Sequence, residues 1–222
     1  MQGFLDETQT DTGAVLGLYG AGGCARDIMP FVRRQFPGKV YFIETNPEKT
    51  EVNGLPLISE DAFFKLSARP LYFNVAINDS LVRESIAERC IARGATPVSL
   101  RERNATVYDN NTIATGAILN ANTTVTSNVV IGKFFHANIY SYVTHDCVIG
   151  DYVTFGPRVG INGNVHIGDH AYIGAGATVK PGDAARPLRI GKGAVVGMGA
   201  VVTKDIDDGQ TVVGNPARVL RP

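Results

Sequence analysis

Histidines are the side chains of this sequence best suited to acid–base chemistry. The chain contains four of them, His136, His145, His166 and His170. His145 is followed directly by Asp146, and an adjacent carboxylate can fix the tautomer of an imidazole and stabilise its protonated form. We therefore expect His145, assisted by Asp146, to act as a general base. We expect His166 and His170 at the surface, and His136 as a reserve base or a substrate contact.

A glycine-rich turn is the second feature that suggests chemistry. An apolar run at 14–19 ends in a turn that contains Gly20, Gly22 and Gly23, and a helical pattern follows. Glycine lets the backbone approach a phosphate closely, and the helix behind the turn offers free N–H groups. Glu44 is placed at the end of the second expected strand to accept hydrogen bonds from a ribose or base. The pattern favours nucleotide binding; the alternative is a tight turn that only packs helix on strand.

The elements that position this turn alternate between strand and helix. Apolar runs predict strands near 14–19, 40–44, 71–77 and 96–100, and helices are expected after the turn, near 60–67 and over 80–93. The first of these helices contains Pro30, which we expect to kink it. This alternation predicts a small parallel sheet with helices on its faces. Such a sheet is too short for a full dinucleotide fold, so a nucleotide-linked sugar is a better ligand than NAD.

A repeat of six residues organises the second half of the chain. Large apolar residues recur at every sixth position from Val107 to Val179, with Ala137 as the one small member. A period of six matches neither helix nor strand and predicts a parallel β-helix with three hexads per coil. Residues 18 apart then stack, as in the expected ladder Val107, Val125, Val143, Ile161 and Val179. The repeat breaks at 181–189, which we expect to form an inserted loop, and 204–222 are expected to form a cap.

Composition supports two domains and excludes several classes of protein. Of the 42 charged side chains, 25 precede residue 107 and only 7 lie between 107 and 181. We therefore expect an α/β domain over 1–104 and a coiled domain over 105–222, joined by a linker at 101–106. The net charge of zero argues against a nucleic-acid partner. The sequence shows no signal peptide and no membrane span, so we expect a cytoplasmic protein.

Three motifs resemble those of a known family. They are the segments 145–150 (His-Asp-Cys-Val-Ile-Gly), 173–179 (Ile-Gly-Ala-Gly-Ala-Thr-Val) and 213–218 (Val-Gly-Asn-Pro-Ala-Arg). With the α/β domain in front, the chain resembles the bacterial sugar acyltransferases among the left-handed β-helix hexapeptide-repeat acyltransferases. This group includes nucleotide-aminosugar N-acetyltransferases and sialic acid O-acetyltransferases. The resemblance implies a left-handed coil, a homotrimer with active sites between subunits, a sugar nucleotide on the N-terminal domain and acetyl-CoA between neighbouring coils.

The resemblance also implies roles for single residues. The family's catalytic histidine falls on His145, and Gly163, 18 residues later, matches the glycine whose N–H reaches the thioester carbonyl. Asn138 matches a polar contact near the sugar amine. Cys24 stands where the family commonly has a histidine in the glycine turn, so a contact to the sugar is expected to differ.

Two further residues are expected to bind acetyl-CoA at a second corner. Ala175 and Met198 each lie two residues after a hexad anchor and stack together once the inserted loop is discounted. Two corners with functional candidates suit a groove between two subunits.

We therefore expect direct transfer of an acetyl group from acetyl-CoA to the C-4 amine of a nucleotide-linked aminosugar. Cys147 falls at an inward position, so no acyl-enzyme is expected. The main alternative is O-acetylation of a hydroxyl, as in sialic acid. A carbonic anhydrase would need three converging metal-binding histidines, and the spacing of His136, His145 and His166 does not fit the period of 18. We expect no metal. A scaffold without CoA binding is a further alternative.

Overall fold

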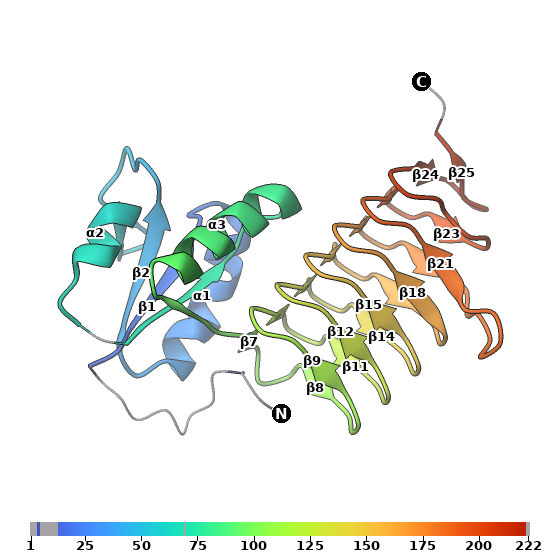
Figure 1. Ribbon diagram of the computed structural model, residues 1–222, viewed down its shortest axis with the longest axis horizontal. Helices are drawn as coiled ribbons and strands as arrows, with labels where there is room; N and C mark the ends of the chain where they lie inside the picture. The colour runs from blue at the N-terminus through green and yellow to red at the C-terminus, as the bar shows by residue number, and fades with distance from the viewer. Residues whose placement is uncertain (1–3, 5–12, 69, 221–222) are drawn as a thin grey trace. The chain divides into compact units, whose positions relative to one another are not determined.

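The computed structural model describes residues 4, 13–68 and 70–220 and divides the chain into two compact units (Figure 1). The first, here the α/β unit, ends at Leu100, and the second, here the coil unit, begins at Arg101. The amino-terminal segment considered for a signal peptide lies outside the described residues, Phe4 excepted. None of the described helices is long and apolar enough to cross a membrane.

The α/β unit contains a six-stranded sheet. Its elements are β1 (Val15–Tyr19), α1 (Gly23–Gln35), β2 (Lys39–Glu44), β3 (Glu51–Val52), β4 (Leu55–Ser59), α2 (Glu60–Lys65), β5 (Leu71–Val75), α3 (Ser80–Ala92) and β6 (Thr96–Pro97). The strand order is β3-β4-β2-β1-β5-β6, and the central β1 is buried at all five positions. The predicted alternation of strands and helices is confirmed.

The expected all-parallel sheet has one exception. Strands β3 and β4 pair antiparallel, whereas β4 pairs parallel with β2. The turn between β3 and β4 is formed by Asn53 and Gly54, both with positive φ (50° and 75°). An Asn-Gly pair with this backbone is a strong hairpin signal. The chain between β2 and α2, for which no strand was expected, therefore forms a hairpin that adds two strands to one edge.

Side-chain contacts fix the helices of this unit. The α3 helix begins after Asp79, whose carboxylate accepts hydrogen bonds from the backbone N–H groups of Leu81 and Val82, both at 3.0 Å. Asp79 is thus the N-cap of α3, a position that favours aspartate. Helix α1 continues through Pro30 to Gln35.

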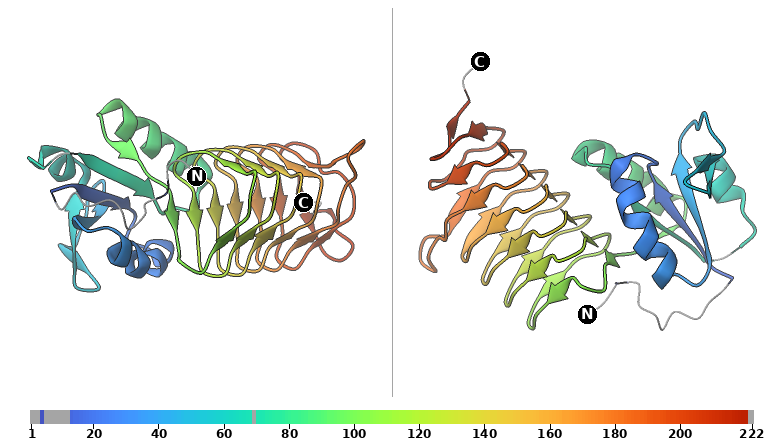
Figure 2. Two further views of the ribbon diagram at one scale, coloured as in Figure 1. Left: turned by 90° about the horizontal axis from the view of Figure 1, so that it is seen from below. Right: turned by 180° about the vertical axis from the view of Figure 1, so that it is seen from behind.

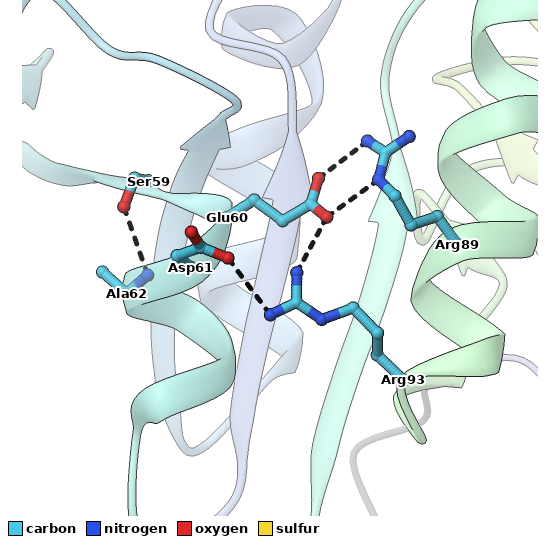
Figure 3. A network of polar contacts seen from close by, with 6 residues as sticks. All are labelled: Ser59, Glu60, Asp61, Ala62, Arg89 and Arg93. Carbon is cyan, nitrogen blue, oxygen red and sulfur yellow. Dashed lines mark hydrogen bonds and ion pairs between the residues drawn. The ribbon is translucent and has the colours of Figure 1, made fainter.

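An ion-pair network joins α2 to α3 (Figure 3). The Arg89 guanidinium donates to both carboxylate oxygens of Glu60, at 2.8 and 2.7 Å, and Arg93 donates to Glu60 at 3.0 Å and to Asp61 at 3.2 Å. The Glu60 side chain is only 7% exposed. The hydrogen bond from Arg89 is the main reason that the pKa of Glu60 lies below its usual value.

The coil unit contains three sheets that run along its length (Figure 2). Sheet I consists of β7 (Leu100–Arg101), β10 (Ile118–Leu119), β13 (His136–Ala137), β16 (Thr154–Phe155), β19 (Tyr172–Ile173), β22 (Val195–Val196), β24 (Thr211–Val213) and β25 (Arg218–Val219). Sheet II consists of β8 (Thr106–Val107), β11 (Thr124–Val125), β14 (Tyr142–Val143), β17 (Gly160–Ile161), β20 (Thr178–Val179) and β23 (Val201–Val202). Sheet III consists of β9 (Thr112–Ile113), β12 (Val130–Ile131), β15 (Val148–Ile149), β18 (Val165–Ile167) and β21 (Leu188–Ile190). From β8 and β10 onward the paired strands are parallel, except β24 with β25, which close the end.

The register confirms the predicted stacking. In sheet II, Val125 pairs with both Val107 and Val143, and Ile161 pairs with Val143 and Val179. Along each coil the chain passes from sheet II to III to I, and we name the bends the II–III, III–I and I–II corners. Many corner residues have left-handed φ, including Asn128, Asp146 and Asn164 in the II–III corner. Asn and Asp tolerate this conformation better than most residues. At the III–I corner the rings of Phe134, Tyr152 and His170 stack at 5.5 and 5.3 Å.

Two predicted boundaries are wrong by a few residues. Strand β7 already belongs to sheet I, so the coil begins at about residue 101 rather than 105, and 101–106 are not a linker. The inserted loop ends at residue 187 rather than 189, because Leu188 and Arg189 belong to β21 and pair with β18. Buried apolar residues form the inward side of each strand of the coil. Leu188 is such a residue, although it lies inside the segment that we expected to be a loop.

Candidate active site

His145 and Asp146 form a hydrogen-bonded pair at the II–III corner. The His145 Nδ1 atom lies 2.7 Å from Oδ2 of Asp146, and the two side chains are 60% and 47% exposed. The corner follows β14, whose Val143 is buried in the coil. With the carboxylate at Nδ1, Nε2 is the ring nitrogen left to take a proton from a ligand.

The backbone around this pair is bonded to the coils on either side. The Asp146 N–H donates to the Ser127 carbonyl at 3.3 Å, and the His145 carbonyl accepts from the Asn164 N–H at 3.1 Å. Asp146 has a φ of 58°, and its Oδ1 accepts a hydrogen bond from Asn128 at 3.3 Å. The corner is therefore held in place although its side chains face solvent.

Gly163 lies directly beneath the His145 ring, one coil further along. The two residues are 18 apart, and a Cβ atom on Gly163 would lie within 3.0 Å of three atoms of the imidazole. Within the described part of the chain, the N–H of Gly163 donates no hydrogen bond. An imidazole and a backbone N–H without a hydrogen bond thus lie side by side, and these are the kinds of group that can serve acyl transfer as base and as oxyanion donor.

The other expected coenzyme and sugar contacts occupy the I–II corner. Ala175 and Met198 stack there in successive coils, with the Gly199 N–H donating to the Ala175 carbonyl at 2.9 Å, and the Met198 side chain is 79% exposed. Asn138 lies at the same corner, and its Oδ1 accepts from the Ile139 N–H at 2.7 Å. Sheet II separates this corner from His145, so the two groups do not lie together within the chain.

The remaining histidines are scattered over the coil. His136 lies on β13 and is only 4% exposed, away from the corner of His145. The His170 ring stacks on Tyr152 at the III–I corner. His166 lies on β18, where burial and the neighbouring Arg189 lower its pKa. Among the described residues, no three His, Cys, Asp or Glu side chains come together as metal ligands would.

The expected nucleotide-binding residues line one cleft in the α/β unit. The cleft has a volume of about 470 Å³ and is bordered by Gly20, Gly22, Gly23 and Glu44. Gly20 has a φ of 95°, a conformation that favours glycine. A side chain at Gly22 or Gly23 would meet no atom within 4 Å, so both glycines face empty space. The structure therefore brings all four residues together.

The N-terminus of α1 points its free N–H groups toward this cleft. Gly22 caps the helix without a side-chain hydrogen bond, and the first turn carries no acidic residue. Such a terminus favours an anionic ligand. Burial, with a smaller contribution from Asp27, raises the pKa of the Cys24 thiol to about 11, so the thiol stays neutral beside an anion.

Sequence reasoning missed several residues that line the same cleft. They include Thr45 at the end of β2, and Ile77 and Asn78 after β5. Both strands pair with β1. Ligands of parallel α/β sheets bind at the carboxyl ends of neighbouring strands, so these positions could have been found from the predicted strand ends.

Comparison with known proteins identifies close relatives. Residues 146–181 match the family model described as bacterial transferase hexapeptide (six repeats), and 164–204 match the hexapeptide repeat of succinyl-transferase. The chain is 45% identical over 211 residues to GDP-perosamine N-acetyltransferase of Escherichia coli O157:H7, covering 92% of this chain and 96% of that protein.

Solved structures agree with this similarity. WeeI from Acinetobacter baumannii AYE has a TM-score of 0.91 and 49% identity, covering 93% of this chain and 100% of that one. PerB from Caulobacter crescentus, solved in complex with CoA and GDP-perosamine, has a TM-score of 0.84 and 26% identity, covering 93% and 97%. The predicted left-handed β-helix is therefore confirmed, and the chain belongs to the hexapeptide-repeat acyltransferases, in the group of nucleotide-aminosugar N-acetyltransferases.

Proposed function

We propose that this enzyme transfers the acetyl group of acetyl-CoA to the sugar amine of GDP-perosamine or a closely similar GDP-linked 4-amino sugar. Its 45% identity to the Escherichia coli enzyme of that name, over nearly the whole length of both proteins, supports this acceptor. The complex of the Caulobacter relative with CoA and GDP-perosamine supports both substrates. The product is a building block for surface polysaccharide or glycan.

The His145–Asp146 pair above Gly163 is the observation that carries the mechanism. The sugar amine attacks the thioester carbonyl, and Nε2 of His145 removes a proton from that nitrogen. The Gly163 N–H donates to the developing oxyanion. When the tetrahedral intermediate collapses, the C–S bond breaks and the CoA thiolate leaves, taking a proton from the imidazolium. Asp146 stabilises the imidazolium while it exists.

No acyl-enzyme is needed for this chemistry. Cys147, the thiol nearest to His145 in sequence, is fully buried, and its Sγ lies 3.2 Å from the Asn162 carbonyl. Burial raises its pKa to about 11, so it is a neutral core thiol and not a nucleophile.

The cleft of the α/β unit is proposed to bind the nucleotide. Its size suits part of a nucleotide sugar, and the α1 N-terminus suits the diphosphate. Glu44 is proposed to accept hydrogen bonds from the ribose or the base.

The active enzyme is proposed to be a homotrimer in the cytoplasm, where acetyl-CoA and nucleotide sugars are made. Ala175 and Met198 lie at a different corner from His145. In the trimer they would therefore contact an acetyl-CoA molecule whose thioester lies beside His145 of a neighbouring subunit. Asn138, at the same corner, and His136 are proposed as contacts to the sugar.

A substitution experiment tests this function. Thiol release from acetyl-CoA is measured with GDP-perosamine, with UDP- and dTDP-linked 4-amino sugars and with free sialic acid. His145→Ala should lower kcat by about 10²- to 10⁴-fold, the range for loss of a general base, with the Kd for acetyl-CoA unchanged. His166→Ala, at a histidine outside the corner, is the matched control and should keep wild-type activity. An active His145→Ala enzyme, or acetylation of sialic acid alone, would overturn the proposal.

A further inference from the structure

We propose that Gly163 is a positioning residue for His145: the absence of a side chain at this position creates the space that the imidazole occupies. The inference rests on the proposed function, because it takes His145 as the base. It is separate from the contribution of the Gly163 N–H, since every residue except proline would supply that group.

The distances at this contact leave no room for a methyl group. A Cβ atom built on Gly163 would lie 2.6 Å from Nε2 and 3.0 Å from Nδ1 of His145, and nearer still to Cε1. Non-bonded carbon atoms prefer separations of about 3.5 to 4.0 Å. The ring would therefore have to move if residue 163 carried a side chain.

The backbone does not explain the glycine. Positive φ values occur at several glycines of the coil, such as Gly176 and Gly199, but Gly163 is not among them. Its carbonyl accepts a hydrogen bond from the Gly182 N–H at 3.0 Å, a contact that any residue would keep. An alanine is thus compatible with the local backbone.

The repeat does not explain the glycine either. The equivalent positions in the preceding coils of the II–III corner are Asp109, Ser127 and His145, all of which carry side chains. The coil therefore tolerates a side chain at this position. What sets residue 163 apart is that the residue 18 positions before it is the histidine.

The ring cannot move without losing its partner. Its Nδ1 atom is held at 2.7 Å by Asp146, and the backbone of Asp146 is fixed by the bond to Ser127. The imidazole is 60% exposed, so it has solvent to move into at little cost in stability. A methyl group at residue 163 should therefore leave the fold intact and displace the base from Asp146 and from the bound substrates.

Gly163→Ala tests the inference, with Gly160→Ala as its matched control. Gly160 lies in the same coil, its φ is also outside the left-handed region, and its Cβ would meet the Tyr142 ring, with 2.6 Å to Oη and 2.7 Å to Cζ. The two variants thus create the same kind of clash with a ring one coil away, but only one of the rings is the proposed base.

We expect Gly163→Ala to lower kcat by about 10²-fold, the effect of a misplacement of about 1 Å, with the KM and Kd for acetyl-CoA within about threefold of wild type. The pH profile of kcat should shift, and the NMR titration of the His145 imidazole should shift with it. Gly160→Ala should keep the wild-type kcat, pH profile and titration.

Each other outcome has a definite meaning. A wild-type kcat and His145 titration in Gly163→Ala would overturn the inference. A weakened acetyl-CoA Kd with an unchanged titration would also overturn it, because the methyl group would then obstruct the coenzyme instead of the base. Full activity of His145→Ala would refute the catalytic assignment itself. If His145→Ala is inactive and Gly163→Ala is normal, only the positioning role fails.

Discussion

Replacement of Asp146 by asparagine isolates the charge that the carboxylate places beside His145. Asparagine has nearly the same shape and tolerates the left-handed φ of 58° at this corner, whereas alanine would add backbone strain. The change removes the negative charge and keeps an oxygen that can accept from Nδ1. It therefore affects the stabilisation of the imidazolium, which forms only as the proton is transferred.

The exposure of the pair sets the expected magnitude. Two unit charges 2.7 Å apart attract by about 6 kcal/mol at an effective dielectric constant of 20, but by only about 1.5 kcal/mol in water. Because the side chains are 60% and 47% exposed, the value for water is the appropriate one. Since 1.36 kcal/mol corresponds to a factor of ten, we expect Asp146→Asn to lower kcat about tenfold.

The assay is kcat from thiol release at saturating acetyl-CoA and acceptor. Asp151→Asn is the control: its Oδ1 accepts from the Lys133 N–H at 2.7 Å at the III–I corner, away from His145, and kcat should stay at the wild-type value. A change of less than twofold in Asp146→Asn would refute the role of the carboxylate. A loss of 10³-fold or more would refute the use of the dielectric constant of water for this pair.

Two stability predictions follow from the cores of the two units. Glu60→Gln should lower the free energy of unfolding of the α/β unit by about 2 kcal/mol at pH 7, because two arginines lose a charged acceptor. The pKa of Glu60 is depressed below 4.5 in the folded protein, so this difference should be full above that pH and disappear as the pH falls through the depressed value; urea unfolding at several pH values measures it. Ile161→Ala, in the buried ladder of sheet II, should cost about 3 kcal/mol in urea unfolding, whereas the control Val148→Ala, 41% exposed on sheet III, should cost less than about 0.5 kcal/mol.

The coil could be predicted from sequence because its determinants are periodic. Each hexad has one inward apolar residue, so the interval of 18 residues alone predicts that Val125 and Val143 are neighbours. The structure pairs them as expected. The predicted end of the loop was wrong because Leu188 and Arg189 already pair with β18, two residues before Ile190, the next apolar residue of the six-residue repeat. Short strands of two or three residues leave little pattern to read at such a junction.

Contacts between distant segments were less accessible to sequence reasoning. Glu60 and Arg89 are 29 residues apart, and no spacing rule connects them, so the network of Figure 3 was not expected. The glycine turn and Glu44 were found because strand ends in a parallel sheet converge. The contact of the His145 ring with Gly163 could be predicted only in part. The interval of 18 predicts that the two residues stack, but only the structure shows that the ring fills the space of a side chain at residue 163.

The inserted loop has a consequence for how this architecture can change in length. Val165 pairs with Leu188, 23 residues later, where the preceding coils of sheet III advance by 18, and yet β21 rejoins sheet III in register. The sheet and register of a strand therefore do not depend on the length of the loop inserted at the preceding corner. The loop leaves the wall at the II–III corner, between β20 and β21, and both strands keep their pairing, whereas a single residue added within a strand would turn the side chains that follow it in that strand to the opposite face. The coil can therefore acquire new surface loops while its chemistry stays where it is.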